Sequence, residues 1–358
     1  MRVLVIGGTG ATGRRTSAEL ARSNEVTELL VGGRDPEVIE RLTSLLGDKV
    51  HPAMIDTADR AELIAACRRA QVVVSCAGPA HEMEETTAAA AVEAGASYVS
   101  LCDDYDAGAA VAELDRRAQQ AGVVVISGCG LAPGITSMLA QLAQDELDEV
   151  DEILISLALS YGDLPTPAHT GHLVHAMSSP PAVISDGKAA RQEAGTSPQL
   201  IYFPEPVGWV ETVAWAHPEV HNFHAAPLRA LSVRCGLTER AAMDALRAAR
   251  SAPLSSTSFI RRTLDVAHTL PPRGPQWSAA RVDVVGTRRG RTVTVSLGVV
   301  DHLVNLASAP LALAAQRLGS GSHEPGVKSP AEAFDARSFL VALGRRGTRV
   351  ARLEPVPI

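Results

Sequence analysis

The sequence predicts an α/β fold, in which a doubly wound parallel sheet is followed by a second, α+β domain with a mixed or antiparallel sheet. Three observations predict this architecture. Short apolar runs alternate with helix-like stretches over residues 1–132, a glycine-rich turn joins the first run to the first helix, and the alternation stops before residue 150. Strands separated by helical crossovers form parallel sheets that helices cover on both faces.

Strand-like and helix-like segments follow each other regularly in the first domain. The strands are predicted over residues 2–6, 26–31, 50–55, 71–75, 98–101 and 123–127. The helices are predicted over residues 12–23, 36–46, 60–70, 83–94 and 107–121. Asp35 followed by Pro36 is typical of a helix N-terminus, and Gly95 is typical of a helix C-terminus.

Residues 150–300 contain strand-like runs without regular helical crossovers, which favours a separate domain for substrate binding or dimerisation. The strands are predicted over residues 153–160, 200–203, 210–215, 228–233, 281–286 and 291–299, and the helices over 239–250 and 259–268. Arg288–Gly290 is a plausible hairpin tip. A helix over 302–318 is apolar enough to demand burial, and another is predicted over 330–343.

The composition is that of a globular protein, with 46% hydrophobic and 20% charged residues. A formal net charge of -7 gives no general attraction for phosphate backbones, so we expect no nucleic-acid partner. The five cysteines include no C-x-x-C pair, which argues against a zinc knuckle. The first strand starts beside Met1, and polar residues interrupt the apolar stretch 303–318. We therefore expect no signal peptide, no membrane span and a cytoplasmic location.

A glycine-rich turn follows the first predicted strand and opens the first helix. It reads G-x-G-x-x-G at Gly8, Gly10 and Gly13, within the run Gly7, Gly8, Thr9, Gly10, Ala11, Thr12 and Gly13. Glycines let the backbone approach a pyrophosphate, and the helix N-terminus supplies free N–H groups. In this strand–turn–helix context the motif predicts a Rossmann domain that binds a dinucleotide.

The end of the second strand indicates which dinucleotide. NAD sites usually place a carboxylate there, but this chain has Gly33 and Arg34. A guanidinium can pair with a 2′-phosphate, so we expect NADP(H). Asp35 is the competing ribose acceptor, although it also fits the cap of the next helix.

Two further turns are expected to contact the dinucleotide. Asp56 ends the third strand, where it meets the adenine edge or starts a turn. The run Cys76, Ala77, Gly78 and Pro79 ends the fourth strand, where the backbone should pass beneath the cofactor.

The candidate catalytic residues are Asp103, Asp104, His169 and His172. Asp103 and Asp104 follow the fifth strand and could orient an amine or relay a proton, while one of them could cap the next helix. His169, His172 and His175 invite a metal hypothesis, but their spacing drifts around a helix and no acidic ligand accompanies them, so we predict no metal. A substrate or acid/base role, or a solvated loop, fits His169 and His172 better.

Other residues of the second half have ordinary structural explanations. His217, His221 and His224, with Glu211 and Glu219 nearby, are interpreted as exposed histidines at a strand edge, although they could bind substrate. Trp209 and Trp215 are expected in the core. Arg261 and Arg262 could hold a carboxylate or lie on a solvated helix face.

Three segments together resemble the saccharopine dehydrogenase (saccharopine reductase) family, including its lysine 6-dehydrogenase-like members. They are Gly7–Gly13, Ala77–Pro79 and Gly130–Gly134, the last being similar to the family's G-x-x-P-G. The resemblance implies two domains, with residues 301–358 packing back on the nucleotide domain. It also implies a homodimer and hydride transfer at a C–N or imine carbon. The run Leu101–Tyr105 departs from the family's acid and Gly-Glu-like turn, which leaves the facing acid undecided.

These features predict an NADP(H)-dependent oxidoreductase of imine reductase or amine dehydrogenase type, acting on a small amino-acid-derived or amine substrate. The substrate is expected between the nicotinamide, the Asp103–Tyr105 turn, the Leu131–Pro133 loop and the His169–His172 segment. Two alternatives stay open. One is a reductase of a C=C or C=O group in a secondary-metabolite intermediate, and the other is a regulatory protein that binds NADP(H) without turnover.

Overall fold

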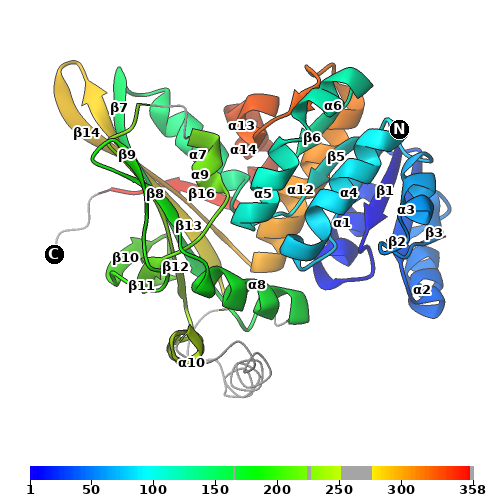
Figure 1. The fold of residues 1–358 in the computed structure, drawn as a ribbon, viewed down its shortest axis with the longest axis horizontal. Coiled ribbons are helices and arrows are strands. Elements are labelled where there is room, and N and C mark those ends of the chain that lie inside the picture. The colour runs from blue at the N-terminus through cyan, green and yellow to red at the C-terminus, as the bar shows by residue number, and fades with distance from the viewer. Residues whose placement is uncertain (164–165, 224–226, 251–275, 355–358) are drawn as a thin grey trace. The chain divides into compact units, whose positions relative to one another are not determined.

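The computed structural model describes residues 1–163, 166–223, 227–250 and 276–354. The chain divides into two compact units, labelled by element in Figure 1. Unit 1 comprises residues 1–134 and 304–335, and unit 2 comprises residues 135–303 and 336–358. The predicted helix over 259–268, with Arg261 and Arg262, lies outside the described residues.

Unit 1 contains a seven-stranded sheet in the order β15-β6-β5-β4-β1-β2-β3, and every pairing in it is parallel. Its strands are β1 (Arg2–Ile6), β2 (Glu28–Gly33), β3 (Val50–Met54), β4 (Val72–Ser75), β5 (Ser97–Ser100), β6 (Val124–Ile126) and β15 (Gly326–Val327). The central strands are runs of β-branched and leucine residues that are almost completely buried, as expected for a sheet covered on both faces. The predicted doubly wound α/β fold is confirmed.

Helices connect these strands, and local capping residues set where they begin and end. They are α1 (Ala11–Ala21), α2 (Pro36–Leu46), α3 (Arg60–Cys67), α4 (Ala80–Ala94), α5 (Tyr105–Ala112), α6 (Asp115–Ala121), α12 (Leu303–Ser320) and α13 (Pro330–Ala333). The Asp35 carboxylate accepts the Val38 N–H at the start of α2, and Gly95 ends α4 in the left-handed conformation. The single helix expected over 107–121 is two helices.

Unit 2 contains a nine-stranded mixed sheet whose main path runs β10-β11-β12-β7-β13-β14-β16. Its strands are β7 (Glu149–Leu159), β8 (Ala182–Ser185), β9 (Lys188–Arg191), β10 (Gln199–Phe203), β11 (Gly208–Ala214), β12 (Ala230–Leu237), β13 (Ser278–Arg288), β14 (Arg291–Asp301) and β16 (Arg349–Arg352). Its helices are α7 (Ile135–Gln144), α8 (Pro167–Ser178), α9 (Glu219–Phe223), α10 (Arg240–Arg250) and α14 (Ala336–Gly344). β12 and β7 are parallel, whereas the other paired strands are antiparallel.

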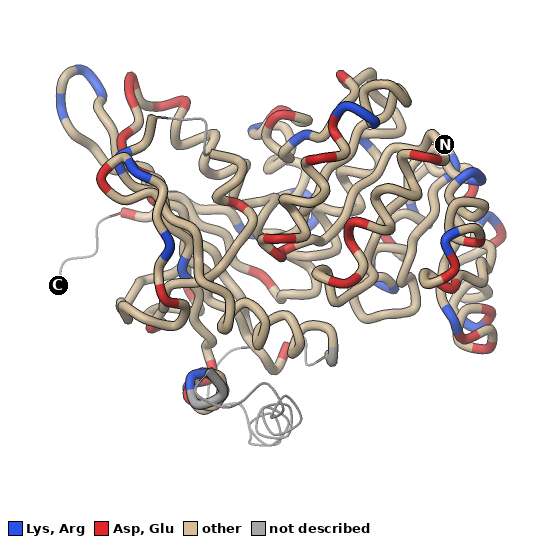
Figure 2. Tube along the Cα trace, viewed as in Figure 1, with Lys and Arg blue, Asp and Glu red and all other residues tan. Residues whose placement is uncertain are grey.

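The β13–β14 hairpin closes at the tip that the sequence predicts. Arg289 and Gly290 both have positive φ values, 53° and 72°, which a tight hairpin turn with the right-handed strand twist requires. The tip is basic, and Figure 2 shows it as a blue segment beyond β14. Acidic residues near the start of β7 balance it, because Glu146 pairs with Arg288 at 3.5 Å and Asp148 accepts the Arg289 N–H at 2.6 Å.

The C-terminal region divides between the two units, which differs from the expectation for residues 301–358. Residues 304–335 belong to unit 1, where β15 pairs with β6 and Cys129 Sγ lies 3.9 Å from the Pro310 carbonyl oxygen. Residues 336–358 belong to unit 2 instead. The reason is β16, which completes an edge of the second sheet by pairing with β14. None of the described helices is both long and apolar enough to cross a bilayer.

Candidate nucleotide-binding site

The turn after β1 leaves a helix N-terminus open to an anion. Gly10 is the N-cap of α1, no side chain caps this end, and the first turn of the helix carries no acidic residue. The Gly10 N–H donates to the Gly7 carbonyl oxygen at 3.1 Å, which closes the turn. The first backbone N–H groups of α1 therefore have no cap from the chain, and such groups with the positive end of the helix dipole bind phosphate.

The glycines of this loop have different reasons to be glycine. A Cβ atom on Gly13 would lie 2.2 Å from the Gly7 carbonyl oxygen, and one on Gly8 would lie 2.7 Å from a methyl of Val31. Gly13 therefore lets α1 pack against the loop backbone, and Gly8 lets the loop pack against β2. A Cβ on Gly10 would meet only the Gly7 carbonyl oxygen, at an ordinary contact distance of 3.4 Å, so the protein's own packing does not require glycine there. Two glycines that allow close packing, Gly8 and Gly13, thus flank Gly10, and this arrangement fits the approach of a pyrophosphate to the loop backbone.

The turn after β4 lies directly against the glycine-rich loop. Gly7 has a φ of 71°, and a Cβ on it would lie 2.9 Å from backbone atoms of Cys76 and Ala77. The segment Cys76–Pro79 then leads into α4. These contacts place the β1 and β4 turns side by side at the carboxyl edge of the sheet, the edge where Rossmann domains bind their ligands.

The end of β2 presents an arginine without a competing carboxylate. Arg34 is exposed, and its guanidinium forms no hydrogen bond or ion pair with any other described residue. Asp35 is committed to the cap of α2 through its 3.2 Å bond to the Val38 N–H. A Cβ on Gly33 would touch the Thr9 side chain at 3.0 Å, so the β2 end adjoins the loop. The residues present fit a 2′-phosphorylated dinucleotide.

Asp56 is exposed and forms a turn after β3. Its carboxylate accepts the Ala58 N–H at 3.0 Å, and its carbonyl oxygen accepts the Asp59 N–H at 3.1 Å. Of the two roles that the sequence allowed for Asp56, the structure therefore contains the turn.

The two acidic residues after β5 differ in their surroundings. Asp104 is 3% exposed and caps α5, because its carboxylate accepts the Ala107 N–H at 2.9 Å. Asp103 is half-buried in the turn itself. The turn after β6 packs against this one, since a Cβ on Gly128 would lie 2.5 Å from the Cys102 carbonyl oxygen. Of the two acids after β5, Asp103 is thus the one whose carboxylate is not committed to the cap of α5.

Glu84 is a polar residue of unit 1 that the sequence reasoning missed. It lies on the inner face of α4 and bonds to hydroxyl groups at the ends of β5 and β6. Burial, the largest cause, raises the pKa of its carboxyl. The signal in the sequence is a glutamate that shares a helix face with Thr87, Ala88 and Ala91, all of them buried.

The candidate histidines of unit 2 lie on a helix, not in a solvated loop. Thr166 caps α8 by accepting the His169 N–H at 3.2 Å, and Pro167 is its first residue. His172 is 8% exposed, and His169 is half-buried with its ring 6.3 Å from that of Tyr161. Both rings are therefore partly shielded from water, which the loop interpretation did not predict.

The second histidine cluster is also different from its prediction. His217 is 2% exposed and Glu219 is fully buried, so neither is an exposed edge residue, and His224 lies outside the described residues. Thr136 and Ser137, on the first turn of α7, donate to the Glu219 carboxyl at 2.7 and 2.8 Å. Burial raises the pKa of Glu219 to about 7. The sequence could not reveal this because the donors precede Glu219 by more than 80 residues.

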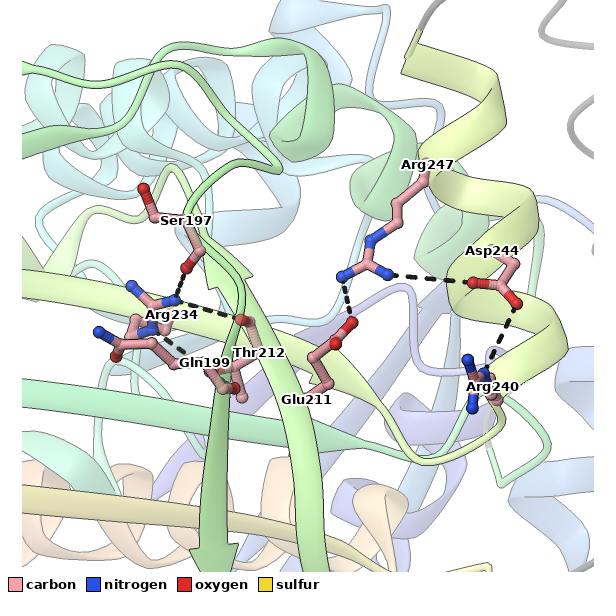
Figure 3. A network of polar contacts seen from close by, with 8 residues as sticks. All are labelled: Ser197, Gln199, Glu211, Thr212, Arg234, Arg240, Asp244 and Arg247. Carbon is pink, nitrogen blue, oxygen red and sulfur yellow. Dashed lines mark hydrogen bonds and ion pairs between the residues drawn. The ribbon is translucent and has the colours of Figure 1, made fainter.

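Glu211, expected near those histidines, belongs to an arginine network instead. Figure 3 shows Arg247 of α10 bridging Glu211 of β11 and Asp244, while Arg234 of β12 bonds to Thr212 and to the Ser197 carbonyl oxygen. The network ties α10 to the sheet. Of the two tryptophans expected in the core, Trp215 is 2% exposed, whereas Trp209 is 50% exposed beside Tyr202.

The fold and the loop define a dinucleotide-binding protein of the Rossmann class. Residues 3–126 match the family model for the saccharopine dehydrogenase NADP binding domain. This match confirms the predicted resemblance to the saccharopine dehydrogenase family, and the domain binds NAD(P)(H). The remaining loop of that resemblance is compact, with the Gly130 N–H donating to the Pro133 carbonyl oxygen at 2.8 Å.

Three comparisons describe the wider relationships. The lipid droplet localized protein of Caenorhabditis elegans is 31% identical over 141 residues, 36% of this chain and 32% of that protein. The trans-acting enoyl reductase of Mycobacterium tuberculosis is 22% identical over 223 residues, 56% of this chain and 53% of that protein. Saccharopine dehydrogenase (L-Glu forming) from Saccharomyces cerevisiae shares the fold, with a TM-score of 0.70 at 15% identity over 99% of this chain and 100% of that chain. The matched segments span about a third to about a half of the curated relatives' length.

Proposed function

We propose that this chain is an NADP(H)-dependent oxidoreductase that transfers hydride between the nicotinamide and the carbon of a C–N or imine group. The substrate class is a small amine or amino-acid derivative. The observation that carries the cofactor choice is Arg34, an exposed guanidinium beside the glycine-rich loop with no acidic partner among the described residues. The family resemblance of residues 3–126 supports the reaction class.

The roles of the chain's own residues follow from their positions. The open N-terminus of α1 and Gly10 would hold the pyrophosphate, and Arg34 would pair with the 2′-phosphate. The nicotinamide supplies or accepts the hydride. We assign the proton relay to one of the candidate residues Asp103, His169 and His172, because carboxylate and imidazole groups are the side chains that most often transfer protons in enzymes.

A second candidate function is reduction of a C=C bond. The observation that favours it is the 22% identity to a trans-acting enoyl reductase over 56% of this chain. An enoyl substrate needs the same hydride and one proton at the neighbouring carbon, so the same residues would serve. The residues that unit 2 presents to the substrate would decide between the two substrate classes, because a fold alone does not determine the chemistry.

A substrate panel tests the proposal. The purified chain is incubated with NADPH and amino acids, aldehyde–amine pairs or enoyl thioesters, and the loss of NADPH absorbance is followed. Turnover with an aldehyde–amine pair supports the first function, and turnover with an enoyl thioester supports the second. Tight NADPH binding with a silent panel would contradict both and favour a cofactor-sensing protein. Light scattering tests the homodimer that we also propose.

A further inference from the structure

Glu84 brings a buried carboxyl group under the carboxyl edge of the unit 1 sheet. It is 3% exposed. Its Oε1 accepts hydrogen bonds from Ser100 Oγ at 2.6 Å and Ser127 Oγ at 2.9 Å, and its Oε2 lies 3.0 Å from Tyr98 OH. These partners are neutral hydroxyls, and no arginine, lysine or histidine among the described residues bonds to Glu84. A buried carboxylate without a cation is costly, so the neutral acid is favoured.

The hydroxyl groups of Thr87 and Tyr98 form a chain of hydrogen bonds that can accept the proton of a neutral Glu84 carboxyl. Thr87 Oγ1 lies 2.9 Å from the Met83 carbonyl oxygen and 2.8 Å from Tyr98 OH. When Thr87 donates its single hydrogen to that carbonyl, it accepts from Tyr98, and Tyr98 is then left as an acceptor for the Glu84 acid. Reversing the chain lets Tyr98 donate to the ionised carboxylate. The same atoms therefore serve both charge states of Glu84.

Glu84 is connected to the two turns that follow β5 and β6. Ser100 Oγ, while donating to Glu84, accepts the Cys102 N–H at 3.2 Å and the Gly128 N–H at 3.1 Å. In the strand order of this sheet, β4, β5 and β6 lie on the side of β1 opposite to β2. The 2′-phosphate end belongs at β2, so the nicotinamide end belongs with these turns.

The other titratable groups near Glu84 are identified by their elements. Asp103, in the turn after β5, adds a negative charge that further raises the pKa of Glu84. Burial and the Glu84 charge raise the pKa of Cys102 in the same turn, and burial raises that of Tyr98 on β5. Asp104 caps α5, with a ring nitrogen of His81 on α4 within 4.8 Å of its carboxylate.

We propose that Glu84 couples one proton to the oxidation state of the bound cofactor. It stays neutral in the complex with NADPH and releases its proton to water in the complex with NADP+. This inference rests on the proposed function. The oxidised nicotinamide ring carries a positive charge that the reduced ring lacks, and a nearby positive charge favours an ionised carboxyl group. Because linkage is reciprocal, rising pH must strengthen NADP+ binding relative to NADPH binding.

The test is the pH dependence of two dissociation constants in the full chain. NADP+ and NADPH are titrated separately from mildly acidic to mildly alkaline pH, and the ratio Kd(NADP+)/Kd(NADPH) is compared. The 2′-phosphate is common to both cofactors, so its own titration cancels in the ratio. We expect the wild-type ratio to fall on the order of tenfold, which corresponds to a pKa lowered by one unit in the oxidised complex.

Variants show which residue causes the pH dependence of the ratio of dissociation constants, called the slope below. Glu84→Gln should make the ratio independent of pH, while Glu85→Gln, an exposed neighbour on α4, should keep the wild-type slope. His81→Asn should also keep it, which separates Glu84 from the His81–Asp104 pair. A flat wild-type ratio, or an unchanged slope in Glu84→Gln, overturns the inference. If neither cofactor binds, the proposed function has failed and the inference fails with it.

Infrared spectroscopy of the wild-type chain keeps the proposal testable if Glu84→Gln does not fold. A buried neutral carboxyl group has a C=O band distinct from that of a carboxylate. We expect a stronger band in the NADPH complex than in the NADP+ complex, because Glu84 adds to a band that Glu219 contributes equally to both complexes. Identical bands in the two complexes would overturn the proposal.

Discussion

Replacing Glu219 by glutamine changes the pH dependence of stability in unit 2. The carboxyl is fully buried, and two hydroxyls of α7 donate to it. His217 lies 4.0 Å away, but its Nδ1 accepts the Glu219 backbone N–H at 3.3 Å, so that nitrogen carries no proton. Glutamine has nearly the same shape and can bond to both hydroxyls, so the variant removes the charge while retaining the packing.

The magnitude follows from the pKa. Burial raises the pKa of Glu219 from 4.5 to about 7. At about 1.4 kcal/mol per unit, ionisation of Glu219 therefore costs the folded state about 3 kcal/mol. Because the folded pKa is the higher one, the stabilising contribution is fully present below pH 4.5 and is lost as pH rises toward about 7. Glu219→Gln should gain about 2–3 kcal/mol over the wild type between about pH 5 and about pH 8.

Urea unfolding followed by tryptophan fluorescence measures this. All three tryptophans, Trp209, Trp215 and Trp277, lie in unit 2, so the signal reports on the unit that contains Glu219. Glu211→Gln is the matched control, because Glu211 is an exposed glutamate of β11 in the same unit, paired with Arg247, and its replacement should leave the pH dependence of stability unchanged. Parallel pH profiles for the wild type and Glu219→Gln would refute the reasoning that burial sets this pKa.

Further variants test packing and catalysis. Gly13→Ala should abolish NADPH binding and lower stability by about 1–3 kcal/mol or more, because its Cβ would lie 2.2 Å from the Gly7 oxygen; Gly10→Ala should weaken binding with little change in Tm. Gly171→Ala, on α8 with no atom within 4 Å of the new Cβ, should stabilise the chain by about 0.5–1 kcal/mol; a lower Tm would contradict this. If His172 relays a proton, His172→Asn should lower turnover roughly a hundredfold at unchanged NADPH affinity, and His221→Asn much less. Equal turnover in the two would exclude that role.

Local signals predicted the parts of the fold that neighbouring residues determine. Asp35 and Pro36 marked the start of α2, Gly95 marked the end of α4, and the glycine-rich run marked the first turn. These features succeed because caps and tight turns depend on residues a few positions apart. The α8 helix carried the same kind of signal in Thr166 and Pro167, but the histidines and Gly171 directed attention to a loop.

Long-range pairing accounts for what the sequence did not reveal. Glu84 bonds to hydroxyls 14, 16 and 43 residues away, and Glu219 to hydroxyls 82 and 83 residues away. Residues separated this far in the sequence form no short-range pattern that could predict their contact. β16 is a four-residue strand whose side chains are exposed, so it lacks the apolar alternation that predicts a strand, and its place is set by pairing with β14.

The relative affinity for NADPH and NADH is the most direct test of the central claim. Fluorescence titration of the wild-type chain should give at least about tenfold tighter binding of NADPH, the preference expected from one charge-assisted bond of about 1.5–3 kcal/mol. Arg34→Ala should remove most of this gap while leaving the affinity for NADH nearly unchanged. Equal affinities in the wild type, or a preference for NADH, would contradict the account and return the ribose role to Asp35.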